Sequence, residues 1–328
     1  MKINLNLDSL AVLLFCGDIV ANNTAALTPE EWYEVERKLK SNIKKSPSRL
    51  FGFNKDSLID ILEIDEFVAY KMVARLSKVD QLLHALTNLE ADGINITTKS
   101  EDNYPKSLLS LKKSAPLYIY NVGNIGIANE MISIVGPQTL DRKLNYFVKV
   151  LLKKMQYEQK VLVSSDIKGV ENFALKTYLQ MGGQAICFVS DHMLDKKKTY
   201  ARYLKEDRLC IMSAVDPYGF FNVTNALDKN MYMCGLSDTQ FISASHINSG
   251  GVWFTSIQNL HYRWTTPVVL NDNKYNGNIR LLEMGAISVS MEDLESELSI
   301  AQVIAKNEVI KEKVEIYIDQ MSIFEFID

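Results

Sequence analysis

Several side chains and glycines that could bind an anion directly follow or precede short apolar runs. They are Gly136, Gln138, Arg142, Ser164, Lys168, Gly169, Lys229, Asn230, Gly250 and Gly251. Glycine lets a phosphate reach backbone N–H groups, and a helix N-terminus at that point favours negative charge. Lysine and arginine supply the opposite charge. Each glycine alone would also suit an ordinary turn, but their shared placement predicts a site for a phosphate-bearing ligand.

Motifs for catalysis and for cofactors are missing from the sequence. The run "MISIVGPQ" is not followed by the GxGxxG pattern of dinucleotide binding, and no phosphate-binding P-loop occurs. The four histidines stand alone, and the four cysteines are scattered without paired spacing, which indicates free thiols and no zinc site. We therefore expect no cofactor, no metal site and no catalytic activity, and an enzymatic function is the less favoured alternative.

The secondary structure that must position these residues is predicted to change along the chain, from helices alone to alternating strands and helices. Residues 1–92 show helical periodicity, with Thr28 and Glu31 as the capping box of one helix. From Ile94, short apolar runs alternate with amphipathic stretches, which predicts an α/β fold with a Rossmann-like, doubly wound and mostly parallel sheet. We expect a helical domain over 1–92, a Rossmann-like domain over 93–290 and an acidic helical tail over 291–328. Such sheets bind ligands at the carboxyl ends of their strands.

Charge is unevenly distributed along the sequence. The net charge is −4, but residues 291–328 hold ten acids and three lysines, so the rest of the chain is mildly basic. The segment Asp141–Lys160 has six basic residues and two acids, which suits either a nucleic-acid contact or a solvated helix face. No apolar run reaches the ~18 residues of a membrane helix. We expect a cytoplasmic protein without membrane contact, in which Leu10–Val20 is a core helix.

Seven segments resemble, in order, the motifs of the DprA/Smf family of DNA-processing proteins. They are "GINITTKSEDNYPKSLL", "SAPLYIYNVGN", "ISIVGPQ", "VLVSSDIKGVENFAL", "NALDKNMYMCGLSD", "SGGVWFTS" and "NGNIRLLEMGA". The resemblance runs from about Gly93 to Ser290. It implies a Rossmann-like domain, single-stranded DNA bound at the strand ends, a homodimer and a recombinase partner.

The sequence departs from the family pattern at its charged positions. Gln138, Lys168 and Lys229 stand where the family has arginine, and Glu171 stands where it has aspartate. Lysine cannot form the bidentate contact that arginine makes with a phosphate, so the resemblance implies a weaker grip on phosphate. The related phosphoribohydrolases need a glutamate in the glycine-rich loop, and "SGGVWFTSIQ" lacks one.

These observations predict a non-catalytic, DprA-like protein that binds single-stranded DNA in DNA processing or recombination. The alternative is a sensor of a nucleotide or nucleotide-derived ligand in the same crevice, in defence or stress signalling. A subunit that mainly assembles through its tail helix is a further possibility. Bases could stack on aromatic residues near the crevice. The candidates are Tyr218, Phe220, Phe221 and Trp253, of which Trp253 also suits the core.

Overall fold

The computed structural model describes residues 5–20, 25–43, 45–124, 129–219 and 222–309. The chain forms two compact units. The first comprises residues 1–126, 189–204 and 210–225, and the second comprises residues 127–188, 205–209 and 226–328. The units interleave along the chain, and the domain boundaries predicted after residues 92 and 290 stay predictions.

The first unit begins with five helices, and side chains cap the N-termini of the first four. They are α1 (Leu7–Cys16), α2 (Pro29–Ile43), α3 (Lys55–Asp60), α4 (Glu66–Leu76) and α5 (Val79–Ala91), with 3-10 turns η1 (Pro47–Gly52) and η2 (Lys106–Ser114). At α2, the Glu31 N–H donates to Thr28 Oγ1 (3.2 Å) and the Thr28 N–H donates to Glu31 Oε2 (2.9 Å). This confirms the predicted capping box. Helix α1 is buried on all sides from Ala11 to Cys16, as expected of a core helix, although it runs from Leu7 to Cys16 and not from Leu10 to Val20.

The first unit also contains an antiparallel group of strands. Strand β2 (Tyr118–Val122) pairs with β1 (Asn95–Thr98) on one side and with β6 (Leu209–Ser213) on the other. Two short helices, α8 (Met193–Thr199) and α9 (Ala201–Lys205), precede β6. Strands β1 and β2 were not predicted, because they lie in the motif-rich segment whose alternation is short and broken by polar residues.

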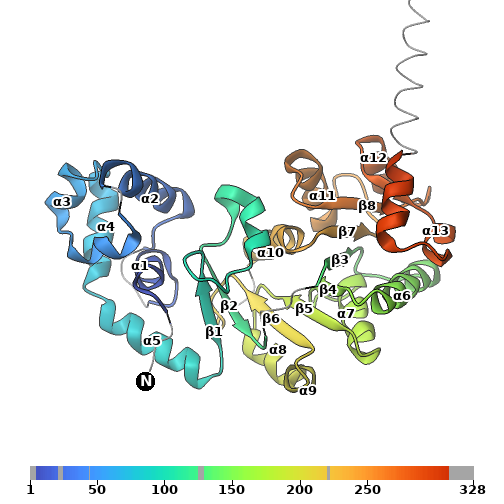
Figure 1. The fold of residues 1–328 in the computed structure, drawn as a ribbon, viewed down its shortest axis with the longest axis horizontal. Coiled ribbons are helices and arrows are strands. Elements are labelled where there is room, and N and C mark those ends of the chain that lie inside the picture. The colour runs from blue at the N-terminus through green and yellow to red at the C-terminus, as the bar shows by residue number, and fades with distance from the viewer. Residues whose placement is uncertain (1–4, 21–24, 44, 125–128, 220–221, 310–328) are drawn as a thin grey trace, which may run out of the picture. The chain divides into compact units, whose positions relative to one another are not determined.

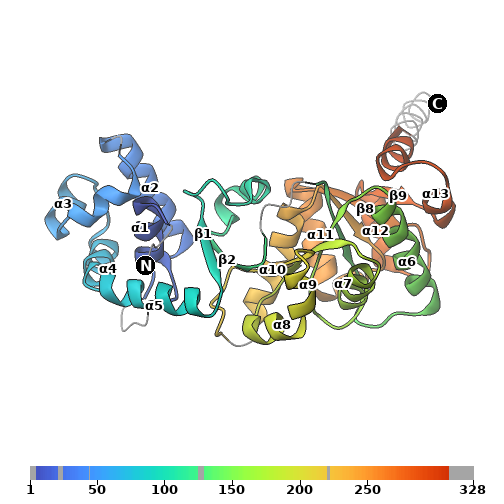
Figure 2. The ribbon, with the colours of Figure 1, turned by 60° about the horizontal axis from the view of Figure 1, so that its bottom comes forward.

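The second unit holds six parallel strands flanked by helices (Figures 1 and 2). The strands are β3 (Met131–Val135), β4 (Val161–Ser164), β5 (Gln184–Phe188), β7 (Thr239–Ile242), β8 (Thr266–Leu270) and β9 (Ile287–Val289). The helices are α6 (Arg142–Tyr157), α7 (Val170–Gln180), α10 (Val223–Leu236), α11 (Gly250–Tyr262), α12 (Asn276–Glu283) and α13 (Met291–Glu295). The alternation of strands with helices and the parallel pairing of the strands confirm the predicted Rossmann-like fold class.

The strand order in this unit is β5-β4-β3-β7-β8-β9. The chain starts at β3, moves outward through β4 and β5, and returns to the other side of β3 with β7. Strand order therefore reverses between β3 and β7, where Val135 is paired with Ile242. Because the helices on either side of a reversal diverge, a crevice forms beyond these two strand ends.

The strands of this sheet read as continuous apolar runs because both of their faces are covered. Val161, Leu162 and Val163 of β4 are fully buried, and so are Ile132 and Ile134 of β3. The four cysteines are buried thiols, as expected. Among the described helices, none is long and apolar enough to cross a membrane.

The acidic tail begins with α13 and a helical segment at residues 300–309. Ile300 and Val303 are buried, so the start of the tail belongs to the folded core. The sequence also predicts an apolar stripe along the tail helix, which continues through Ile310, Val314, Ile318 and Met321, outside the described residues.

Candidate nucleic-acid interface

A cavity of about 310 Å³ lies in the second unit, where β3 and β7 end. Its walls come from the β3–α6 loop, the start of α7, the middle of α10, the β7–α11 loop and the first turn of α11. The lining residues are Gly136, Pro137, Gln138, Ile167, Glu171, Lys229, Asn230, Ala244, Ser245, His246, Ser249, Gly250, Gly251 and Val252. The cavity therefore occupies the point of strand reversal, where the sheet topology predicts a ligand.

Glycines at two turns allow the cavity walls to approach one another. Gly169, directly before α7, has a φ of +125°, and a Cβ there would lie 2.4 Å from the carbonyl oxygen of Pro137. A Cβ on Gly251 would lie 2.5 Å from Nδ2 of Asn230. The amide of Asn230 thus lies against the first turn of α11, at a distance that only a glycine permits.

The N-terminus of α11 opens into this cavity. Its N-cap residue, Ser249, makes no side-chain capping hydrogen bond within the described chain. The N–H groups of a helix's first turn need acceptors, and the helix dipole adds partial positive charge at the same place. Gly250, Gly251 and Val252 all line the cavity, so an anionic ligand could accept hydrogen bonds from this turn.

A buried pair of opposite charges completes the cavity. Lys229 on α10 is 2% exposed and Glu171 on α7 is 7% exposed. Burial raises the pKa of the Glu171 carboxyl to about 7, although the charge of Lys229 and the backbone N–H groups of Glu171 and Gly136 lower it. The sequence gave one indication of this pair: Glu171 stands where the family motif has an aspartate, and Lys229 stands where it has an arginine.

Six of the ten predicted site residues line the cavity. They are Gly136, Gln138, Lys229, Asn230, Gly250 and Gly251. The other four are elsewhere in the second unit. Arg142 is exposed at the start of α6, Lys168 is exposed in the β4–α7 loop, and Gly169 is the N-cap of α7. Ser164 is buried, and its hydroxyl donates to the carbonyl oxygen of Glu171 (2.9 Å), so it supports the cavity wall.

The basic segment of α6 is only partly available to a ligand. Lys143 pairs with Asp272 (2.9 Å), and Lys154 donates to the carbonyl oxygen of Ser296 (2.8 Å). Lys160 pairs with Glu130. The remaining basic residues of the segment are exposed. They are Arg142, Lys149 and Lys153.

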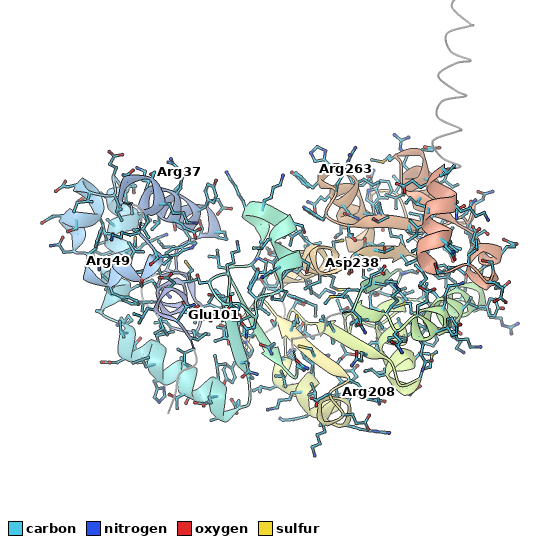
Figure 3. All side chains as sticks on the ribbon, viewed as in Figure 1. Arg37, Arg49, Glu101, Arg208, Asp238 and Arg263 are labelled. Atoms are coloured by element: carbon cyan, nitrogen blue, oxygen red, sulfur yellow. The ribbon has the colours of Figure 1, made fainter. Side chains whose placement is uncertain are left out.

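Asp238 and Asp166, for which the sequence pattern indicates no partner, have structural roles. Figure 3 labels Asp238, which lies at the amino end of β7, the opposite edge of the sheet from the cavity. Its carboxylate accepts the N–H of Met131 at the start of β3 (2.8 Å). Asp166 accepts a hydrogen bond from the side chain of Asn172. These contacts hold strand and helix starts in place.

Of the aromatic candidates for base stacking, those that the structure describes do not line the cavity. Trp253 is 6% exposed and packs in the core of the second unit. Tyr218 belongs to the first unit, where its hydroxyl donates to Asp92 (2.7 Å). Phe220 and Phe221 lie outside the described residues.

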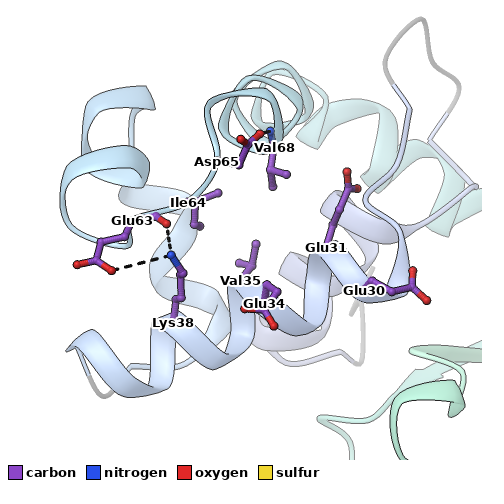
Figure 4. A pocket seen from close by; sticks show the side chains of 9 residues that line it. All are labelled: Glu30, Glu31, Glu34, Val35, Lys38, Glu63, Ile64, Asp65 and Val68. Carbon is purple, nitrogen blue, oxygen red and sulfur yellow. Dashed lines mark hydrogen bonds and ion pairs between the residues drawn. The ribbon is translucent and has the colours of Figure 1, made fainter.

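A larger cavity, of about 560 Å³, lies in the first unit between α2 and the start of α4 (Figure 4). The side chains of Val35, Ile64 and Val68 point into it. Five carboxylates and one ammonium line it. They belong to Glu30, Glu31, Glu34, Glu63, Asp65 and Lys38. This charge repels phosphate, so the smaller cavity of the second unit is the better site for an anion.

Comparison with known families identifies the chain. Residues 95–299, more than half of its length, match the family described as DNA recombination-mediator protein A. The chain belongs to this family. The match includes every residue of the cavity in the second unit. No curated protein matches the sequence.

Two solved structures of DNA processing protein A (DprA) resemble the family member described here. The Streptococcus pneumoniae protein is 18% identical with a TM-score of 0.68, and the match covers 92% of this chain and all of that one. The Helicobacter pylori protein is 20% identical with a TM-score of 0.51, and the match covers 62% of this chain and 94% of that one. That second structure concerns the single-stranded DNA binding mode of the Helicobacter protein. At these identities the likeness shows the DprA fold.

Proposed function

We propose that this protein binds single-stranded DNA in the cavity beyond β3 and β7, as a non-catalytic protein of DNA processing and recombination. One observation carries the proposal: six residues that are far apart in the sequence meet around a single cavity at the point of strand reversal. They supply an ammonium group, two amides and backbone N–H groups at a helix N-terminus. The family description and the DNA-binding relative from Helicobacter pylori support the nature of the ligand.

The size of the cavity favours a single strand. Its volume of about 310 Å³ is at the small end of the range for small-molecule sites. It can hold roughly one nucleotide unit, while the rest of a strand lies along the surface outside. Because Lys229 is buried, a phosphate must enter the cavity to reach it, which a flexible single strand allows more readily than a rigid duplex.

The direct test is a titration of short oligonucleotides, single-stranded and duplex, followed by fluorescence anisotropy. We expect binding of the single strand that weakens with salt, with a log–log slope of about −0.7 for each phosphate neutralised. Absence of binding at low salt would contradict the proposal. A thermal shift with mononucleotides in the absence of DNA binding would favour the nucleotide-sensor alternative instead.

We further propose that the protein acts as a homodimer with a recombinase partner in the cytoplasm. The support for a dimer is a group of exposed apolar side chains on the adjacent helices α11 and α12, a kind of surface that often marks an interface. They are Phe254, Tyr262, Ile279 and Met284. Light scattering should give twice the chain mass, and Phe254→Glu should convert the protein to a monomer without loss of helicity.

A further inference from the structure

The charge inside the DNA-binding cavity is balanced by Glu171. Lys229 and Glu171 both line the cavity, and both side chains are more than nine-tenths buried. With both groups ionised, this pair contributes no net charge to the site. A desolvated site that binds a phosphodiester needs net positive charge, because an uncompensated anion is costly to bury.

An ionised Glu171 opposes an anionic ligand in two ways. Its carboxylate repels the phosphate across a cavity with little water, where charges interact more strongly than in bulk solvent. It also competes with the phosphate for the ammonium group of Lys229, whose charge acts directly on Glu171. A protonated Glu171 removes both effects and leaves the charge of Lys229 for the ligand.

We propose that Glu171 determines the affinity of this cavity for anions, and that its carboxylate takes up a proton from solvent when single-stranded DNA binds. This inference rests on the proposed function and specifies how the same site is controlled. Bound DNA and protonated Glu171 then stabilise each other, since each makes the other less costly to bury.

The protonation equilibrium of Glu171 falls in the range where this coupling is effective. Its pKa is about 7 in the free protein, because burial outweighs the opposing effects of Lys229 and of the N–H groups of Glu171 and Gly136. A phosphate in the cavity adds negative charge and raises that pKa further. Below pH 7 the acid is mostly neutral and affinity is high. Above pH 7 proton uptake accompanies binding, and affinity falls by up to about tenfold for each pH unit.

Other ionisable groups near Glu171 must be separated from its effect. His246, in the β7–α11 loop, lines the same cavity, and Lys229 faces it from α10. Asp166 and Lys168 lie in the loop before α7, and Lys149 of α6 lies over the ring of Phe173 on α7. Histidine side chains are the usual source of pH dependence near neutral pH, and His246 is the histidine in this cavity lining. The variant His246→Asn therefore serves as the main control.

The experiment is isothermal titration calorimetry with an oligothymidylate that has no terminal phosphate, so that the ligand itself does not titrate near neutral pH. Binding is measured at constant ionic strength from pH 6 to pH 8.5, and at pH 7.5 in both HEPES and Tris. These buffers differ in protonation heat, so the difference in binding heat gives the protons taken up. Wild type, Glu171→Gln, His246→Asn and, as a matched charge control outside the cavity, Asp166→Asn are compared.

We expect the wild type to take up a substantial fraction of a proton at pH 7.5 and to lose affinity with rising pH. Glu171→Gln should bind at pH 8 at least as tightly as the wild type does at pH 6, with no proton uptake. His246→Asn and Asp166→Asn should retain the wild-type uptake. Equal uptake in wild type and Glu171→Gln, or its loss in His246→Asn, would overturn the inference.

The wild-type measurement decides the question even where a variant does not fold. DNA binding without proton uptake and without pH dependence would overturn this inference and leave the proposed function standing. Absence of DNA binding at every pH would overturn both.

Discussion

At the scale of single residues, the cavity depends on a cation that is supplied from inside the protein. Lys229 is buried on α10 and lines the cavity, whereas Lys168 is exposed in the loop before α7. Both were predicted as phosphate-binding residues, from two different motifs of the same family. A buried ammonium interacts with a phosphate more strongly than an exposed one, because solvent screens it less.

We therefore predict that Lys229→Gln reduces the affinity for single-stranded DNA by about tenfold or more, as for other charged hydrogen bonds. Its salt slope should become less steep by about 0.7, the loss of one phosphate contact. Lys168→Gln should change affinity only a few-fold. Anisotropy titrations at several salt concentrations measure both quantities, and Lys153→Gln on α6 is the control. Equal losses for Lys168 and Lys229 would argue against the cavity as the main contact.

A second prediction concerns the stability of the folded chain against pH. The pKa of Glu171 is raised to about 7 from an ordinary 4.5, so the native state binds this proton more tightly than the unfolded state. Stability from this group is complete below pH 4.5 and is lost as pH rises to 7, by about 3 kcal/mol at most. Glu171→Gln should lack this loss. Urea denaturation of both proteins at pH 5 and pH 8 measures it, and parallel pH profiles would contradict the assignment.

At the scale of elements, the first turn of α11 is the part of the site most sensitive to small changes. Gly250 and Gly251 are adjacent, yet their surroundings differ. A Cβ on Gly250 meets nothing within 4 Å, although the φ of +75° disfavours other residues. A Cβ on Gly251 would overlap the side-chain amide of Asn230. The two glycines thus serve different purposes, one for the turn and one for the approach of α10.

We predict that Gly251→Ala weakens DNA binding while the protein stays folded, because the end of the Asn230 side chain can move away. Gly250→Ala should instead lower stability by about 1 kcal/mol, the cost of a left-handed backbone for alanine, with a smaller effect on binding. Anisotropy titration and urea denaturation of both variants separate these effects. The prediction fails if Gly250→Ala weakens binding more than Gly251→Ala.

At the scale of the whole molecule, the structure describes the acidic tail up to residue 309. The part up to residue 309 belongs to the fold. Leu294, Ile300 and Val303 are buried, and Asp293 pairs with Lys306 (2.8 Å). Deleting residues 293–328 would be the simplest way to ask whether the tail screens the basic remainder of the chain. The structure shows that this deletion would also remove core residues, so it cannot isolate an electrostatic effect.

Deletion of residues 310–328 is the appropriate test. This segment has five acids and two lysines, and its removal leaves Ile300 and Val303 in place. We predict that the shortened protein keeps the thermal stability of the full chain and binds single-stranded DNA more tightly at low salt, with the difference vanishing as salt screens the charges. Unchanged affinity at low salt would show that the tail does not shield the DNA site.

The sequence by itself determined the class of fold and supplied the candidate residues of the site. Strand and helix periods differ and are local, so the alternation after Ile94 was sufficient to predict the parallel sheet. The capping box at Thr28 and Glu31 was predictable for the same reason, since its partners are three residues apart. Strand β9 was missed because it has only three residues, and β1 and β2 were missed because polar residues break the apolar alternation of their segment.

Only the tertiary structure decided which of the candidate residues meet. Glu171 and Lys229 lie on different helices, and their pairing follows from the placement of α7 and α10 beside the same strand ends. Burial of Glu171 then raises its pKa to about 7 against the opposing charge of Lys229, an effect that no local pattern contains. The sequence supplies the charges, but the distance between them and their exclusion from water arise when distant segments pack together.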